Sequence, residues 1–106
     1  EAILKATDTD SAVTGFSRGS AVRCLKNDFT DEFLALERAG APQAELDKLA
    51  TGTNRMGAVD GDLKRGAVLV GQSLNVLKDI LPCKEVIERL ISEAKVTLAK
   101  AKDIEL

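Results

Sequence analysis

The sequence predicts a mainly α-helical chain with one or two short β-strands, and three observations support this. Apolar residues recur at three- and four-residue spacing in residues 28–50 and 82–102, as in helices that bury one face. β-branched residues lie on either side of the loop between Gly15 and Gly19 in residues 11–26, which favours short extended segments. The chain has 106 residues and 8 glycines, so we expect one small, loop-rich unit.

The first 26 residues divide into two predicted segments. Residues 1–6, EAILKA, favour helix, but no capping residue precedes them, so we interpret them as the last turns of a truncated helix. Residues 11–26 form the short extended region. Gly15 and Gly19 interrupt it and predict a loop that needs positive φ.

Residues 28–50 are predicted to form a helical hairpin. The first helix has three candidate N-caps, namely Asn27, Asp28 and Thr30. Gly40 ends this helix, and Pro42 occupies a position typical of the first turn of a second one. Leu46 and Leu49 supply the inward stripe of the second helix.

Residues 53–78 are interrupted by glycine about every five residues, which argues against one long helix. We predict a short helix, a turn at residues 60–62 and a further helix from about Leu63. Residues 67–77 carry apolar side chains on more than one face, which indicates a segment covered by protein on several sides.

Residues 82–102 are predicted to form the C-terminal helix, introduced by Pro82. Its apolar stripe lies opposite a charged face and consists of Val86, Ile87, Leu90, Ile91, Ala94 and Leu98.

Composition argues against several classes of partner. The net charge is -2, with 30% charged residues of both signs, so no basic face is available for nucleic acid or an anionic membrane. The longest apolar run is far shorter than the roughly 20 residues of a membrane span, and no signal-peptide pattern is present, so we expect a cytoplasmic protein. Cys24 and Cys83 lie far apart and no histidine is present, which favours reduced thiols and no metal site.

Several short motifs have a structural interpretation. Residues 66–73, GAVLVGQS, resemble a phosphate-binding loop but lack its lysine. The paired aspartates in residues 8–10 and 60–62 lack the further oxygen ligands of a calcium loop. Arg23, Lys26 and Asn27 could contact an anion, or could make local ion pairs and caps. No acid/base pair is evident, so we expect no catalytic residue in this chain.

Three blocks in a fixed order carry a family resemblance. They are residues 3–15, ILKATDTDSAVTG, residues 22–27, VRCLKN, and residues 61–73, GDLKRGAVLVGQS. Together they resemble the C-terminal segment of the FMN-dependent enoyl-acyl carrier protein reductases and of the related nitronate monooxygenases, once called 2-nitropropane dioxygenases. The likeness covers nearly the whole chain.

The resemblance implies a (β/α)8 barrel that binds FMN and that lies upstream of this segment. NAD(P)H reduces the flavin in the reductases, and nitronates are oxidised in the monooxygenases. This chain would then be a helical cap that docks on the missing N-terminal barrel portion and is not catalytic alone. Homo-oligomerisation is left open. Gly71, Gln72 and Ser73 would approach the flavin and substrate cleft, with the alternative that they only pack against the barrel.

The chain departs from the family pattern at Phe16, at Ser20 and Ala21, and at Leu74 and Asn75, which obscures the subfamily. Two other functions stay open: an independent helical protein-interaction module, and a helical domain for a small molecule, although no convergent polar cluster is evident. As a fragment of an FMN oxidoreductase, the chain would expose the apolar surface of residues 67–77 and tend to associate.

Overall fold

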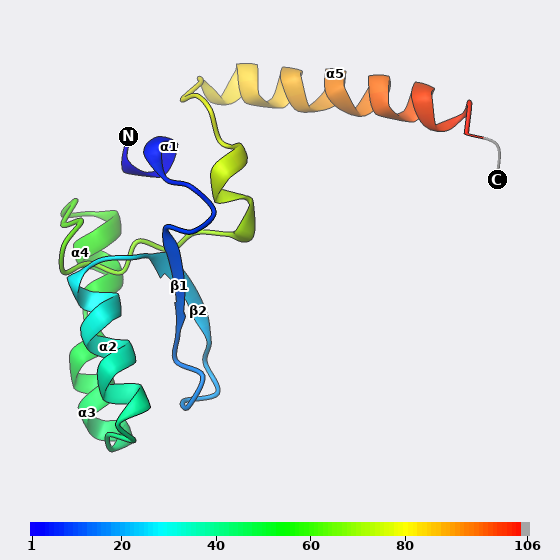
Figure 1. Cartoon of the computed structure of the whole chain (residues 1–106). Coiled ribbons are helices and arrows are strands. Elements are labelled where there is room, and N and C mark those ends of the chain that lie inside the picture. The colour runs from blue at the N-terminus through cyan, green and yellow to red at the C-terminus, as the bar shows by residue number, and fades with distance from the viewer. Residues whose placement is uncertain (105–106) are drawn as a thin grey trace.

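The computed structural model describes residues 1–104 of the chain (Figure 1). The helical elements are α1 (Ala2–Lys5), α2 (Asp28–Arg38), α3 (Gln43–Ala50), α4 (Thr53–Ala58), the 3-10 helix η1 (Gln72–Val76) and α5 (Cys83–Ala101). The strands are β1 (Ser11–Thr14) and β2 (Val22–Leu25). The predicted mainly helical chain with one or two short strands is therefore confirmed.

The two strands form an antiparallel hairpin, in register from Ser11 opposite Leu25 to Thr14 opposite Val22. Residues 68–70 run along the other edge of β2. There the Leu25 N–H donates to the Val68 carbonyl at 2.9 Å, and the Val70 N–H donates to the Arg23 carbonyl at 3.0 Å. The backbone groups on both edges of β2 are thus paired.

Asn27 joins α2 to the loop that precedes residues 68–70. Its Oδ1 accepts from the Thr30 N–H at 3.0 Å, and the Thr30 hydroxyl accepts from the Asn27 N–H at 2.9 Å, which forms a capping box. The Asn27 Nδ2 donates to the carbonyls of Leu63 at 3.0 Å and Gly66 at 2.8 Å. One side chain therefore fixes the start of α2 and the course of residues 63–66.

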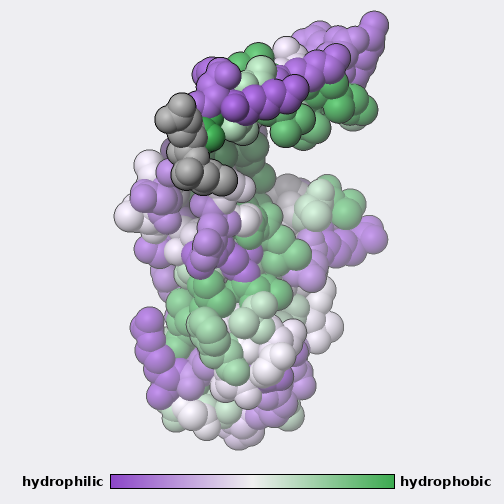
Figure 2. All heavy atoms as spheres, turned by 90° about the vertical axis from the view of Figure 1, so that its right-hand side faces the viewer, coloured by the Kyte–Doolittle hydropathy of each residue, from purple (hydrophilic) through white to green (hydrophobic). Residues whose placement is uncertain are grey.

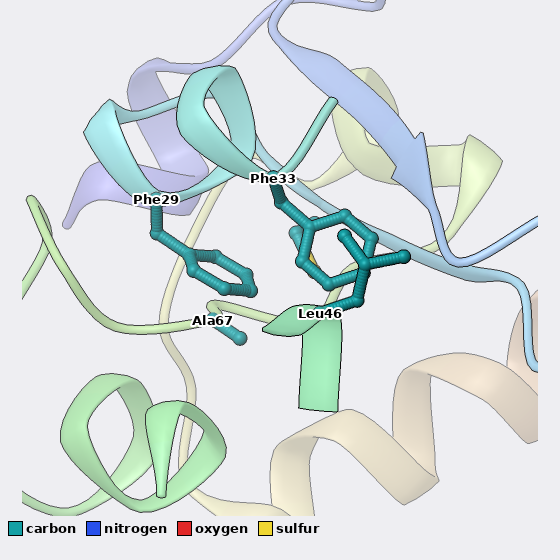
Figure 3. Packing of buried hydrophobic residues seen from close by; sticks show 5 residues of the cluster. Phe29, Phe33, Leu46 and Ala67 are labelled. Atoms are coloured by element: carbon teal, nitrogen blue, oxygen red, sulfur yellow. The ribbon is translucent and has the colours of Figure 1, made fainter. Parts of the chain in front are cut away.

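A small core lies where α2, α3, β2 and Ala67 meet (Figure 3). Phe29 and Phe33 project from successive turns of α2, with ring centroids 5.8 Å apart. Leu46 of α3 and Cys24 of β2 complete the cluster, and all of its members are buried. This packing holds the α2–α3 hairpin, which occupies the range predicted for it, against the strands.

The helix predicted from about Leu63 is wrong. The Asp62 carboxylate accepts from the N–H groups of Lys64 and Arg65, both at 2.9 Å, which stabilises a turn. Residues 68–70 then pair with β2 instead of coiling, and helical structure returns only at η1. A short apolar run such as residues 67–70 is compatible with either helix or strand. Here it is extended because the open edge of β2 offers backbone hydrogen bonds to it.

Helix α5 occupies most of the predicted C-terminal range and projects away from the body formed by α1 to α4 (Figure 1). All of its residues are exposed. Hydrophobic atoms gather along one side of this projecting arm (Figure 2). A bidentate ion pair between Arg89 and Asp79, at 2.9 and 3.2 Å, fastens the preceding linker to the helix. No helix within residues 1–104 has the length and apolar character needed to cross a membrane.

Candidate functional site

The predicted site residues Gly71, Gln72 and Ser73 lie together on the surface, where residues 68–70 give way to η1. Gly71 is extended, with φ -99° and ψ 177°, and Gln72 begins η1. The next residue, Leu74, is only 2% exposed and anchors the segment to the body. Residues 71–73 are therefore exposed to solvent, and the buried side chain of Leu74 holds them on the body of the chain.

Gly71 differs from the glycines that the fold requires. A Cβ built on Gly66 would lie 2.3 Å from the Gly57 nitrogen, and one built on Gly57 would lie 2.8 Å from the Ala67 carbonyl oxygen. A Cβ on Gly71 would meet nothing nearer than the Ser73 Oγ, at 3.6 Å, which is an ordinary contact. Packing within residues 1–104 therefore explains Gly57 and Gly66 but gives no reason for glycine at position 71.

The side chains of Gln72 and Ser73 make no hydrogen bond with any other residue in the range 1–104. The amide offers two donors and an acceptor, and the hydroxyl offers one donor and an acceptor. These exposed groups are therefore free to bind a ligand or a neighbouring chain.

A pocket of about 520 Å³ lies between α1, α4 and residues 61–69, and its wall extends along the chain as far as Leu69. Its wall is mostly apolar, with Ile3, Leu63, Ala67 and Leu69 among the lining residues. α1, which forms one wall, also contacts η1. Sequence reasoning missed this pocket, because its walls come from segments that only the tertiary fold brings together.

A second, more polar cavity of about 230 Å³ lies between the β1–β2 hairpin, α2 and the start of α4. Arg18 lines it, with Nη2 2.5 Å from the Asp47 carboxylate and the guanidinium 5.9 Å from the centre of the Phe33 ring. Its Nε is the one buried side-chain nitrogen or oxygen in residues 1–104 that has no hydrogen-bond partner. No pattern in the sequence brings Arg18, Asp47 and Phe33 together, because they come from separate elements.

Glu37 of α2 holds the hairpin loop closed. Its carboxylate accepts from the Ser17 N–H at 2.8 Å, the Ser17 hydroxyl at 2.7 Å and the Gly15 N–H at 3.3 Å. Partial desolvation opposes ionisation, but these hydrogen bonds prevail and the pKa of Glu37 is lowered. Glu37 thus has a structural role.

The anion site considered at Arg23, Lys26 and Asn27 is not assembled. Arg23 donates to the Ser11 hydroxyl at 2.8 Å, and the polar atoms of the Asn27 side chain are used in capping and loop contacts. In the stretch described, residues 1–104, no three histidine, cysteine, aspartate or glutamate side chains cluster as metal ligands.

Comparison with known structures gives a clear match. FabK from Thermotoga maritima is 33% identical to this chain, with a TM-score of 0.85. The match covers 94% of this chain and 32% of FabK. A FabK mutant from the same organism matches with 31% identity and a TM-score of 0.74, over 94% of this chain and 29% of its own length.

This chain is therefore similar in sequence and structure to part of FabK, and spans about a third of the length of those structures. No protein-family model matches the chain, and comparison with curated proteins gives no significant match. The match supports the resemblance to the enoyl-acyl carrier protein reductases. It does not support the resemblance to the nitronate monooxygenases.

Proposed function

We propose that this chain is the C-terminal segment of an FMN-dependent oxidoreductase of the enoyl-acyl carrier protein reductase type. The observation that carries the proposal is the 33% identity to FabK over 94% of the chain. In such an enzyme the segment packs on a (β/α)8 barrel that binds FMN, and NAD(P)H reduces the flavin. The segment is not catalytic alone. A nitronate monooxygenase is the related alternative activity, and a cytoplasmic location stays a prediction.

Within this enzyme, residues 71–73 approach the flavin and substrate cleft. Three features of the segment support this placement: Gly71 leaves its backbone open to close approach, the Gln72 amide is free, and the Ser73 hydroxyl is free. FMN supplies the redox chemistry when bound. The contribution of this chain is to position polar groups and to shield the cleft from water.

The apolar face of α5 and the apolar residues of the linker before it are the surface that docks on the barrel. Ile80 in the linker is 73% exposed, and Leu90 and Leu98 on the apolar stripe of α5 are 63% and 65% exposed, which is unusual for a group of large aliphatic side chains. The same exposed face also favours the second candidate function, an independent helical module that binds a partner protein. The two functions differ in whether a flavin barrel is the partner.

A chimera separates them. The matching third of Thermotoga maritima FabK is replaced by this chain, and the purified protein is assayed for bound FMN and for NAD(P)H oxidation with an enoyl thioester. We expect FMN to be retained and turnover to be measurable, whereas the FabK portion without its C-terminal third should lose turnover. A folded chimera that lacks FMN or turnover would contradict the proposal.

Gly71→Ala and Gly71→Trp in the chimera test the placement of residues 71–73. Alanine is sterically compatible with the chain alone, so both the fold and much of the activity should persist. Tryptophan should block close approach and lower turnover by a factor of ten or more, with an unchanged melting temperature. Equal activity of Gly71→Trp and the unsubstituted chimera would place this segment away from the cleft.

A further inference from the structure

The outer edge of β1 carries free backbone hydrogen-bonding groups. Residues 10, 12 and 14 direct their backbone groups toward β2, as the bond from the Lys26 N–H to the Asp10 carbonyl at 2.9 Å indicates. Because the backbone groups of an antiparallel strand point alternately to its two edges, Ser11 and Val13 direct theirs away from β2. Within residues 1–104 the N–H and C=O groups of these two residues have no hydrogen-bond partner. This edge can therefore pair with one further strand.

The free edge forms one wall of a groove of about 600 Å³ between β1 and α2. Ala12 and Val13 line the groove on the strand side, and Leu34 lines it on the helix side. Phe16, which follows β1 in the hairpin loop and is 70% exposed, also lines it. A free strand edge beside apolar side chains is the arrangement that binds an extended peptide as an added strand.

The charged groups of the groove favour an acidic occupant. Lys26 and Arg38 both line it, both are exposed, and neither forms an ion pair within residues 1–104. Lys26 precedes α2 and Arg38 ends it, so the two cations flank the helix. Glu37 also lines the groove, but its carboxylate already accepts three hydrogen bonds from the hairpin loop. A second copy of this chain would bring its own Lys26 and Arg38 to the groove, and repulsion between these like charges disfavours self-pairing.

We propose that the groove between β1 and α2 binds an extended, acidic peptide segment of a partner protein, which adds to the outer edge of β1 as a further strand. The free backbone groups of Ser11 and Val13 hold the backbone of the segment. Its apolar side chains lie against Phe16 and Leu34, and its carboxylates lie near the two basic side chains. The backbone bonds give affinity for extended chains, and the apolar and basic side chains give selectivity. The inference goes beyond the proposed function, because it uses neither residues 71–73 nor the apolar face of α5.

Two capped peptides test the occupant. The acidic probe is Glu-Glu-Val-Thr-Val-Thr-Glu-Glu, and the basic probe has lysine in place of every glutamate. The isotope-labelled chain is titrated with each probe and followed by NMR. At low ionic strength the acidic probe should bind roughly tenfold or more tightly than the basic one. Amide shifts should be largest at Ser11 and Val13, and the amide hydrogens of these two residues should exchange more slowly in the complex.

Two substitutions, each with a matched control, make the test specific. Val13→Pro removes an edge N–H that points away from β2, so the β1–β2 ladder is kept, and it should weaken binding of the acidic probe roughly tenfold. Val13→Thr keeps both the shape and the N–H and should bind nearly as well as the unsubstituted chain. Arg38→Glu, at an exposed residue, should weaken binding roughly tenfold. Lys48→Glu makes the same change of charge on α3, outside the groove, and should have little effect.

Several results would overturn the assignment. These are failure of the acidic probe to bind, equal binding of the basic probe, amide shifts confined to α5, and unweakened binding by both Val13→Pro and Arg38→Glu. Self-association that Val13→Pro abolishes in analytical ultracentrifugation would assign the edge to a second copy instead. A folded FabK chimera should bind the acidic probe, and a chimera that fails to do so would show the groove covered. Arg38→Glu should leave turnover of the chimera unchanged, so peptide binding and the proposed function are tested separately.

Discussion

Gly66→Ala provides the sharpest test of how this fold is held together. A Cβ at this position would lie 2.3 Å from the Gly57 nitrogen, 2.5 Å from the Gly57 Cα and 2.5 Å from the Asp62 carbonyl oxygen. An ordinary contact needs at least 3.4 Å, so each is about 1 Å too short. All three neighbours are backbone atoms, and no side-chain rotation can relieve them. The residue does not have positive φ, so the effect is purely steric.

Overpacking of this kind typically costs 1–3 kcal/mol, and three rigid contacts place Gly66→Ala at or above about 3 kcal/mol. For a domain of this size that corresponds to a melting temperature lowered by roughly 12 °C or more. Thermal unfolding followed by circular dichroism, with urea titration as a second measure, gives the value directly.

Gly71→Ala is the matched control. Its backbone is extended, and the nearest contact of a new Cβ is 3.6 Å, so alanine should leave stability unchanged or raise it by about 0.5 kcal/mol. If Gly66→Ala melts within 2 °C of the parent chain, α4 and residues 66–67 do not pack as closely as described. The explanation of the glycine pattern by packing would then fail.

Other substitutions probe the capping, the acid stability and the exposed helix. Asn27→Ala removes the N-cap and both loop hydrogen bonds, and should cost about 2–4 kcal/mol in urea unfolding, with Asn27→Asp intermediate because only the cap survives. The N–H groups of Arg65 and Lys64 lower the pKa of Asp62 in the folded chain. The stability that ionised Asp62 contributes is therefore present above its ordinary pKa of about 4, and it is lost as the pH falls through the lower pKa of the folded state. Asp62→Asn should reduce the loss of melting temperature between pH 6 and pH 3. The exposed apolar face of α5 predicts that the isolated chain self-associates; Leu90→Asp should then shift its sedimentation toward the monomer in analytical ultracentrifugation without changing the core melting transition, and an unchanged sedimentation profile would exclude α5 as the associating surface.

The sequence was sufficient for the elements whose signals are local. Asn27 was one of three candidate N-caps, and the capping box forms there because its partner Thr30 is three residues away. Gly40 ends α2 with φ 72°, a conformation that glycine adopts at little cost. The helical hairpin follows from apolar spacing together with Gly40 and Pro42, and the C-terminal helix follows from the apolar spacing after Pro82.

Features that depend on distant partners could not be predicted in this way. Residues 68–70 become extended because the free edge of β2 offers hydrogen bonds, and nothing within the run distinguishes this outcome from helix. The close approach of Gly57 and Gly66 and the contact of Glu37 with the loop at Ser17 join separate parts of the chain. The sequence predicts the candidate site only in part: residues 71–73 follow from the family resemblance, whereas the apolar pocket between α1, α4 and residues 61–69 depends on the tertiary fold.

The position of α5 gives the strongest physical reason to expect a large partner. Most of the stability of a helix in a protein comes from packing an amphipathic face and not from helix propensity. α5 has such a face, and all of its residues are exposed. The Arg89–Asp79 pair orients its first turns but is itself about half exposed, so it contributes little to stability. The apolar face of α5 is therefore suited to pack against another protein surface, and under the proposed function the remaining part of a FabK-like enzyme provides that surface.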